Sequence, residues 1–539
     1  MKITRRAMLI GSAVLAGSLA VARGIFPLPK PTIPGAILGA ASSAGHRLRH
    51  PDFPSPSETI DKELVIIGGG IAGLAAGYRL AQCGMNDFMM LELEDHIGGN
   101  SHSGVNEVSA YPWGAHYVPL LTAEATAVHK LFEELGIITE YDKAHLPVYN
   151  EFYLGSDPHE RLYINGVWIE GLVPAIGASP EEHMQIKRFF HLMEHYKNAK
   201  GNDGKRAFAI PLDKSSQDSD FLALDHITMT AWLTSQHFTS PHLLWYIHYC
   251  CRDDYGATAN DVSAWAGIHY FAARNGTAAN TTSYSVITWP EGNGWLVKRL
   301  AAPFADKIQT NAITYHVEEN GSHVIIDYCD RLTNKSTRIR AKTAIIAAPR
   351  FVAARILSPA LSAEPYQYSP WMVANITLSK LPEGYGEPLS WDNVVYDSQL
   401  IGYVTATHQH LDMKPLKTVL TYYWPLSHLP PAEARTEALH RPYEEWQRII
   451  LAELLAIHPE LEGHVERVDI WLWGHGMIRP TPGFIWGDAR RSALLPKPPI
   501  FFAHSDMSGI SIFEEAYTHG VTAAEHALGY LNIPYQSVL

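Results

Sequence analysis

Three glycines follow a short apolar block near the start of the chain. Gly68, Gly70 and Gly73 form Gly-x-Gly-x-x-Gly directly after Leu64–Ile67. In this spacing the first glycine makes a tight turn, the second lets the backbone approach a phosphate, and the third lets a helix pack on a strand. Free N–H groups at the start of the following helix favour an anion. The run 63–77 therefore predicts a strand, a phosphate-binding turn and a helix.

A carboxylate follows the next apolar stretch. Phe88–Leu91 reads as a second buried strand and is followed by Glu92. A carboxylate in this place accepts hydrogen bonds from a ribose and disfavours a 2′-phosphate. A glycine-rich loop of another kind of α/β protein is the alternative, but strand, turn, helix, strand and acid in this order favour a dinucleotide site.

A glycine pair continues this pattern. Gly98 and Gly99 follow Glu92 closely, and Asn100 comes next. The run resembles the FAD-dependent amine oxidase superfamily, which has Gly-Gly-Arg here and includes amine and polyamine oxidases, protoporphyrinogen oxidase and carotenoid-type desaturases. The resemblance implies bound FAD with these three residues near its phosphates. Asparagine can donate to a phosphate oxygen but carries no charge.

Further matches to this superfamily follow in the expected order. Gly114-Ala115-His116 resembles a run that passes close to the flavin ring. Ile308–Ile313 resembles the strand whose backbone meets the adenine, which makes Ile313 a candidate contact. Trp473 resembles the tryptophan beside the flavin. The resemblance makes these residues candidate cofactor contacts.

Two motifs near the C-terminus resemble the same superfamily. The stretch 499–506 ends in Asp506, which the resemblance assigns to the ribityl chain of the flavin. In 514–524, the helix start at Ala516 and Tyr517 would direct backbone N–H groups at the pyrimidine edge of the flavin. There the helix dipole stabilises negative charge on the reduced ring.

The resemblance implies removal of a hydride from a substrate carbon to the flavin N5 atom. For an amine this gives an imine that water hydrolyses, and oxygen or another acceptor reoxidises the flavin. His116 and His475 are candidate polar groups near the ring, although most histidines in proteins are structural. In the resemblance, Asn375 or the adjacent Ala374 occupies the position of the lysine of amine oxidases. Lys380 lies too far along the strand to take that position.

The sequence supports three functions. The first is an oxidase of an amine or polyamine. The second is a desaturase-like or protoporphyrinogen-oxidase-like enzyme that dehydrogenates a carbon skeleton, which the missing lysine favours. The third is a flavin-binding subunit without catalysis, which the departures Asn100, His504 and Glu515 from the superfamily motifs keep open.

The stretch 243–256 is dense in aromatic residues and ends in Asp253 and Asp254. It could line a substrate cavity in which the acids anchor a cationic amine. A helix packed in the core with an exposed acid pair at its end is the simpler interpretation. Cys250 and Cys251 are interpreted as two buried thiols, with a strained vicinal disulfide as the alternative.

The length and composition of the chain predict at least two domains of the α/β class. With 539 residues and 46% hydrophobic content, the chain can bury a large core. A net charge of −13 without a basic cluster argues against a nucleic-acid partner. No cysteine spacing suits zinc, and we expect no metal. Apolar spacing predicts helices at 123–136, 180–199 and 441–457, and Asn320-Gly321 predicts a hairpin.

We expect a discontinuous Rossmann-type FAD-binding domain with an inserted α+β substrate domain. Thr4-Arg5-Arg6 and the apolar run after it resemble a twin-arginine signal peptide, which implies the twin-arginine export machinery as a partner, a periplasmic or otherwise exported protein, and no membrane span after processing. The predicted parts are a signal peptide at 1–22, a linker at 23–60, FAD-binding segments at 61–118, 287–360 and 470–539, and substrate-domain segments at 119–286 and 361–469.

Overall fold

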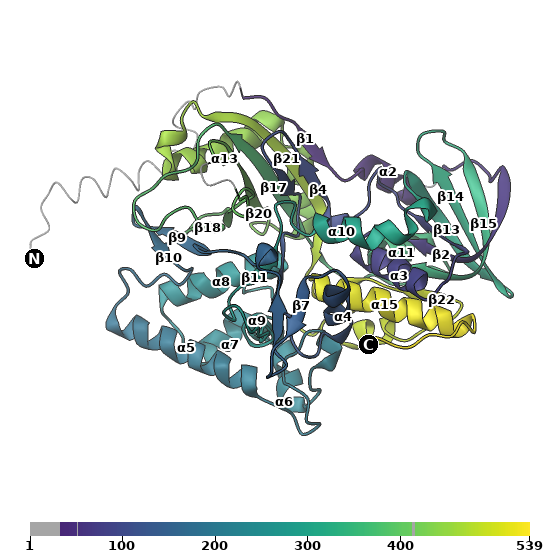
Figure 1. The fold of residues 1–539 in the computed structure, drawn as a ribbon, viewed down its shortest axis with the longest axis horizontal. Helices are drawn as coiled ribbons and strands as arrows, with labels where there is room; N and C mark the ends of the chain where they lie inside the picture. Colours follow the sequence, from purple (N-terminus) through teal and green to yellow (C-terminus); the bar gives the residue numbers. More distant parts are fainter. Residues whose placement is uncertain (1–32, 51, 412–414) are drawn as a thin grey trace, which may run out of the picture.

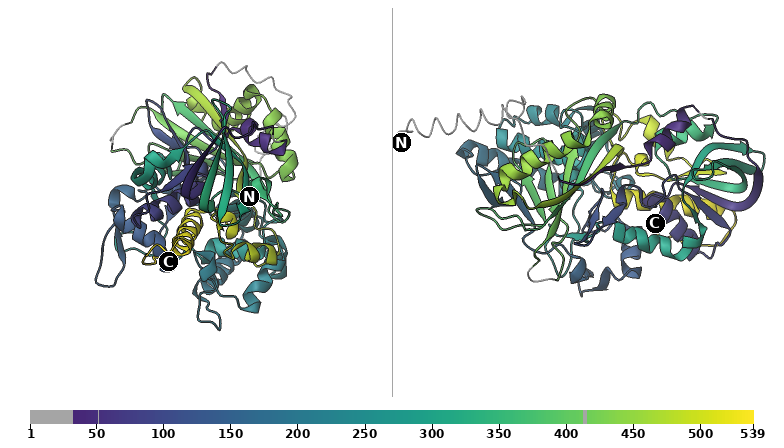
Figure 2. Two further views of the ribbon diagram at one scale, coloured as in Figure 1. Left: turned by 90° about the vertical axis from the view of Figure 1, so that its right-hand side faces the viewer. Right: turned by 90° about the horizontal axis from the view of Figure 1, so that it is seen from above.

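The computed structural model describes residues 33–50, 52–411 and 415–539. Two large β-sheets with their helices lie side by side along the long axis of the molecule (Figures 1 and 2). The predicted signal peptide and the first ten residues of the predicted linker lie outside the described residues.

One sheet carries the nucleotide-binding pattern. Its parallel centre has the order β12-β3-β2-β15, β22 pairs with β15, and β14, β13 and β16 continue the sheet. The strands are β2 (Glu58–Ile67), β3 (Phe88–Leu91), β12 (Ile308–Gln309), β13 (Ala312–Asn320), β14 (His323–Asp330), β15 (Ser336–Ile346), β16 (Leu357–Ser358) and β22 (Ile500–Phe502). Helix α3 (Ile71–Gln82) follows β2 and packs against α15 (Phe513–Tyr530). The two ends of the chain thus meet at one helix pair.

The second sheet has eight strands in the order β1-β21-β17-β20-β19-β18-β9-β10. These are β1 (Ile37–Gly39), β21 (Val465–Ile478), β17 (Tyr368–Leu378), β20 (Thr418–Pro425), β19 (Gly402–Thr405), β18 (Asp392–Val395), β9 (Glu160–Ile164) and β10 (Val167–Glu170). Helices α12 (Pro431–His440) and α13 (Tyr443–Ile457) share one apolar cluster with the sheet, and α8 (Pro241–Tyr255) shares another. The sheet is therefore covered by different helices on its two faces.

A helical layer joins α8 below the second sheet in Figure 1. It contains α5 (Pro180–Asn198), α6 (Ser219–Leu222), α7 (Met229–Ser235) and α9 (Ala264–Ala272), which share one buried cluster. Helix α5 begins with a capping box: Ser179 Oγ accepts from the Glu182 amide, and the Glu182 carboxylate accepts from the Ser179 amide.

The structure confirms the mixed α/β class and the elements with strong periodicity. Predicted helices correspond to α4 (Thr126–Glu134), α5 and α13. The predicted hairpin is the β13–β14 pair, with Gly321 in its turn at φ 63°. Cys250 and Cys251 are buried free thiols, so no vicinal disulfide forms.

Two predicted boundaries fall within helices or strands of the structure. The predicted linker contains β1 and α2 (Ser42–His46), and β2 already begins at Glu58, so its described part is folded. The predicted boundary between 469 and 470 falls inside β21, which pairs with β17 along its length. In both cases the backbone is held by pairing with a strand that is distant in sequence: β1 pairs with β21, and β21 pairs with β17. Local composition does not indicate such pairing.

Candidate functional site

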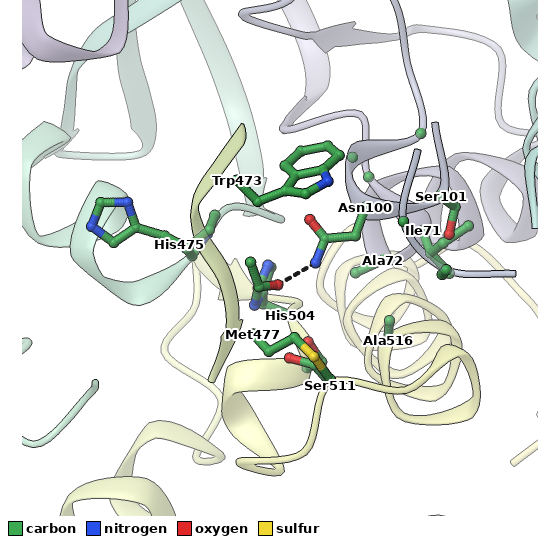
Figure 3. Close-up of a pocket in the computed structure, with 18 of the residues that line it drawn as sticks. Ile71, Ala72, Asn100, Ser101, Trp473, His475, Met477, His504, Ser511 and Ala516 are labelled. Atoms are coloured by element: carbon green, nitrogen blue, oxygen red, sulfur yellow. Dashed lines mark hydrogen bonds between the residues drawn. The ribbon is translucent and has the colours of Figure 1, made fainter. Parts of the chain in front are cut away.

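A cavity of about 440 Å³ lies where the two sheets meet. The glycine-rich turn after β2, strand β21 and the start of α15 line one part of it, as Figure 3 shows. The ends of α8 and α9 and strands β17 and β20 line the other part. Of the predicted site residues, the following line the cavity: Gly68, Gly70, Glu92, Gly98, Gly99, Asn100, Gly114, His116, Trp473, His475, Asp506 and Ala516.

Glycine suits the three positions of the turn for different structural reasons. A Cβ on Gly68 would lie 2.5 Å from the Ala347 carbonyl oxygen, and one on Gly73 would lie 1.9 Å from the Gly68 oxygen. Gly73 therefore serves packing of helix on strand and does not line the cavity. Gly70 has ordinary extended angles, φ −72° and ψ −178°, and a Cβ there would have only Gly99 Cα, at 4.0 Å, as a neighbour. The wall between Gly70 and Gly99 is thus bare backbone, as a pyrophosphate requires.

Glu92 is oriented by two backbone amides. Its Oε2 accepts from the Gly69 amide at 2.6 Å, and its Oε1 accepts from the Glu94 amide at 2.8 Å. Burial raises the pKa of Glu92 above its usual value, and the two amide bonds oppose that rise. Each carboxylate oxygen retains lone pairs on the cavity side, so ribose hydroxyls can still donate to it.

Asn100 links the glycine-rich half of the cavity to β21. Its Nδ2 donates to the Gly476 carbonyl oxygen, shown as the dashed line in Figure 3. Trp473 faces the same space, and its Nε1 donates to the Trp113 carbonyl oxygen at 2.6 Å. One hydrogen of the Asn100 amide is therefore used inside the protein, and the other remains for a phosphate oxygen.

The Asp506 carboxylate is fixed by hydrogen bonds and by a neighbouring histidine. Its Oδ2 accepts from the Arg350 amide at 2.8 Å and from the Tyr368 hydroxyl. His504 Nδ1 lies 3.0 Å from Oδ1. Burial alone would raise the pKa of Asp506, but His504 together with these hydrogen bonds holds the pKa below its usual value. Asp506 is thus an ionised acceptor suited to a hydroxylated chain.

The two candidate histidines are neutral at neutral pH. Burial lowers the pKa of His116 to about 4, and burial together with nearby arginines lowers the pKa of His475 to about 4. His116 lies among aromatic rings, with Tyr423 4.8 Å away between centroids. His475 stacks on Phe351 at 4.3 Å and, in Figure 3, points away from Trp473 and Asn100. The geometry is therefore against a catalytic role for His475.

Three other predicted site residues do not line the cavity. Asn375 is buried in β17, beyond the cavity-lining part of that strand. Ile313 is buried between Ala312 and Thr314, which both line the cavity, and Tyr517 packs in the core beside Phe513. Side chains alternate along a strand, so an assignment one residue off turns a side chain away from the site. The Ile313 side chain is turned away in this manner, which leaves its predicted backbone contact untested, and Tyr517 lies on the core face of α15.

Asn375 has a structural role instead of the predicted catalytic one. Its Nδ2 donates to the Pro112 carbonyl oxygen at 3.0 Å, and its Oδ1 accepts from Thr421 Oγ1 at 2.7 Å. Val373, two residues earlier, lines the cavity.

Asn375→Ala should therefore lower the free energy of unfolding by roughly 2 kcal/mol, because it leaves two buried partners unpaired. Denaturant unfolding measures this loss, and the variant should retain any bound cofactor as well as the unmodified protein does. Loss of bound cofactor without loss of stability would return Asn375 to the site.

The acid pair at the end of α8 is not an exposed helix end, which corrects the simpler interpretation above. Asp253 and Asp254 both line the cavity. Asp254 pairs with Arg274, which also lines the cavity. Asp253 has no hydrogen-bond partner on its side chain among the described residues; burial first, and then the charge of Asp254, raises its pKa to about 7.

A third carboxyl group lies at the start of α15. Glu514 is 2% exposed, lines the cavity, and its Oε2 has no hydrogen-bond partner among the described residues. Burial raises its pKa to about 7. Aromatic side chains complete this end of the cavity: Tyr117, Trp371, Tyr423 and Phe513. The aromatic helix that ends at Asp253 is a signal for that residue in the sequence, whereas no local pattern indicates Arg274.

Other site types are not found in the part of the chain that the structure describes. There, no group of three or more His, Cys, Asp or Glu side chains is placed to hold a metal ion. No helix of that part is long and apolar enough to cross a membrane.

Comparison with known proteins identifies the nucleotide-binding part. A family model described as an NAD(P)-binding Rossmann-like domain matches residues 66–135. Polyamine oxidase 7 of Oryza sativa subsp. japonica is 44% identical over 54 residues, which are 9% of this chain and 11% of that protein. Flavin-containing amine oxidase B of Mus musculus is 22% identical over 329 residues, 60% of this chain and 55% of that protein. The chain thus spans about a tenth to about half of the length of these relatives.

Solved structures match over more of the chain. A putrescine oxidase triple mutant gives a TM-score of 0.64 at 17% identity and covers 88% of this chain and 100% of its own. A fatty acid isomerase from P. acnes gives 0.58 at 16% identity and covers 87% of this chain and 98% of its own. The protein therefore has a mixed α/β fold with a Rossmann-like nucleotide-binding domain, and its relatives and structural neighbours include amine oxidases, which are oxidoreductases.

Proposed function

We propose that the protein is an exported FAD-dependent oxidoreductase that oxidises an amine or polyamine. One observation carries the proposal: a single cavity runs from the glycine-rich turn at Gly70 to the carboxyl groups of Asp253 and Glu514. A dinucleotide lying along the first part would end beside the second. The names of several relatives, which are amine and polyamine oxidases, support this assignment.

The residues present fit FAD. Gly70 and Gly99 would receive the pyrophosphate, Glu92 the ribose, and Asp506 the ribityl hydroxyls. The first turn of α15, where Phe513 and Glu514 line the cavity together with Ala516, would face the flavin with the free N–H groups that precede Ala516. When bound, the flavin supplies a hydride acceptor that oxygen or another acceptor regenerates.

The charges of the far end favour a cationic substrate. Asp254 pairs with Arg274, the single cavity-lining arginine among the described residues, and neither Asp253 nor Glu514 forms an ion pair of its own there. An organic ammonium ion would supply that charge in a site with little water. Because both free carboxyl groups have pKa values of about 7, either one can also hold the proton that an ammonium must lose before its carbon is oxidised.

The aromatic walls have a separate task. Tyr117, Trp371 and Tyr423 can enclose the carbon chain next to the ammonium and exclude water from the reacting bond. Neutral His116 offers a polar group without adding positive charge that would repel the substrate.

Dehydrogenation of a carbon skeleton is the second candidate, because no lysine lines the cavity in the part of the chain that the structure describes. Lys380 instead pairs with Glu383 at 3.0 Å. Fatty acids and porphyrinogens carry carboxylates, however, and these would be repelled by the unpaired Asp253 and Glu514.

The non-catalytic alternative is weakened by the partners of Glu515. Its Oε1 accepts from the Leu212 amide at 2.6 Å, and its Oε2 accepts from Ser508 Oγ. This departure from the superfamily motif is thus built into the packing and does not obstruct the cavity.

We also propose that the protein is exported by the twin-arginine route. This route carries folded proteins, so a flavoprotein can take up FAD before it crosses the membrane. The supporting residues are Arg5 and Arg6 with the apolar run behind them.

Anaerobic mixing of the purified protein with single compounds tests the function. We expect diamines and polyamines to bleach the oxidised flavin, and an uncharged analogue of the same length to leave it coloured. Release of peroxide in air would identify oxygen as the acceptor. A yellow protein that is bleached only by a carboxylate-bearing lipid or porphyrinogen would favour the second candidate, and one that nothing bleaches would favour a binding subunit.

A further inference from the structure

The segment 36–49 connects the two halves of the molecule. Strand β1 pairs in parallel with β21, with Ile37 opposite Ile470 and Gly39 opposite Leu472. The chain then leaves the second sheet, forms α2, and continues as the short 3₁₀ helix η1 (Arg47–Arg49) against α11 (Arg350–Ile356) of the nucleotide-binding half. Figure 1 shows β1 and α2 lying across the junction of the two sheets.

Hydrogen bonds fix this segment to the loop that carries the ribose-binding acid. The Ala41 amide donates to both carboxylate oxygens of Glu94, at 2.8 and 3.1 Å. Glu94 lies two residues after Glu92 and donates its own amide to Glu92 Oε1. The segment and the ribose contact therefore share one hydrogen-bonded unit.

Two residues of the segment form part of the cavity wall. Ala40 and Leu48 both line the cavity. Leu48 packs with an apolar group that contains Ala348, Val352 and Ile356, and these three also line the cavity. Ala312, next to the strand end assigned to the adenine, belongs to the same apolar cluster and also lines the cavity. An aromatic base fits the apolar slot that these residues form.

We propose that residues 36–49 form a clasp that binds the adenosine half of the dinucleotide and holds it in the cavity. The inference rests on the proposed FAD site. The base would lie between Leu48 and the slot on α11, and it could leave only after the β1–β21 pairing or the Ala41–Glu94 bonds open. The clasp therefore acts mainly on the rate of cofactor release.

Two substitutions weaken the clasp at different points. Leu48→Ala removes the wall over the slot. Gly35→Ala would place a Cβ 1.7 Å from the Val468 carbonyl oxygen and 2.3 Å from the Tyr443 hydroxyl, which displaces the start of β1 from β21. Gly45→Ala is the matched control, because a Cβ there meets nothing within 4 Å.

Release of FAD from the full holoprotein is followed by its fluorescence after dilution into a scavenger of free FAD. We expect Leu48→Ala and Gly35→Ala to release FAD at least about tenfold faster than the unmodified protein, and Gly45→Ala to match it. Equal release rates in Leu48→Ala and the unmodified protein would overturn the clasp. An unmodified protein that binds no FAD would instead overturn the proposed function, so the two failures are distinguishable. If Gly35→Ala does not fold, Leu48→Ala still decides.

Discussion

Gly70→Leu is expected to give a folded protein that purifies without FAD. Gly70 has extended backbone angles that any residue adopts, so the substitution introduces no backbone strain. Its side chain would instead extend into the cavity toward Gly99, through the space that the pyrophosphate needs. The visible flavin spectrum of the purified protein and the melting temperature of the FAD-free form measure the two effects separately.

Gly529→Leu is the matched control for this prediction. Gly529 is exposed near the end of α15, and the nearest atom to a Cβ there is 3.9 Å away, so the same enlargement should leave FAD content unchanged. A Gly70→Leu protein that retains FAD at the level of this control would contradict the phosphate-binding assignment. An FAD-free Gly70→Leu protein that is also unfolded would indicate a packing role.

The nucleotide-binding half could be predicted from the sequence because its contacts are local. The turn at Gly68 and Gly70 and the acid at Glu92 belong to one strand–helix–strand unit, and backbone geometry fixes which residue types it accepts. Asp506 could be found from the motif around it, although the strand before it reaches the site by pairing with β15, which is distant in sequence.

The substrate half could not be predicted to the same depth. Arg274 becomes part of the site only because α8 and α9 pack so that it reaches Asp254, and no local pattern reports that pairing. Asn375 has the residue type of an active-site group but is used to join β17 to β20 and Pro112. The role of Ala40 and Leu48 is equally non-local, because β1 gains its place from the free edge of β21.

Asp253 and Asp254 are adjacent in sequence, line the same cavity and should respond oppositely to substitution. Asp254 neutralises Arg274, whereas Asp253 has no partner among the described residues. Asp253 is partly buried, and a partly buried carboxylate without a partner destabilises the folded state. We infer that it is kept because it binds the substrate cation of the proposed function. Stability and activity therefore separate the two roles.

Asp253→Asn should stabilise the protein at high pH and weaken its activity toward cationic amines. Burial raises the folded-state pKa of Asp253 to about 7, well above its value in an unfolded chain. Below the unfolded value both states are protonated and the group has no effect on stability. As pH rises to about 7 the unfolded state ionises first, so the native protein loses stability that the asparagine variant keeps. The gain at pH 8 should be roughly 2 kcal/mol, allowing for water in the cavity.

Asp254→Asn should instead destabilise the protein by roughly 2 kcal/mol at neutral pH, because it leaves the partly buried Arg274 without its ion-pair partner. With a diamine as substrate, Asp253→Asn should also lower kcat/KM roughly 30-fold, which corresponds to about 2 kcal/mol of lost charge pairing. An uncharged substrate analogue should bind equally to Asp253→Asn and to the unmodified protein. Thermal unfolding at pH 5 and pH 8, together with flavin bleaching rates, measures these effects. If both asparagine variants lose stability equally, with no change in kcat/KM, then Asp253 has a structural role and the cation must bind elsewhere in the cavity.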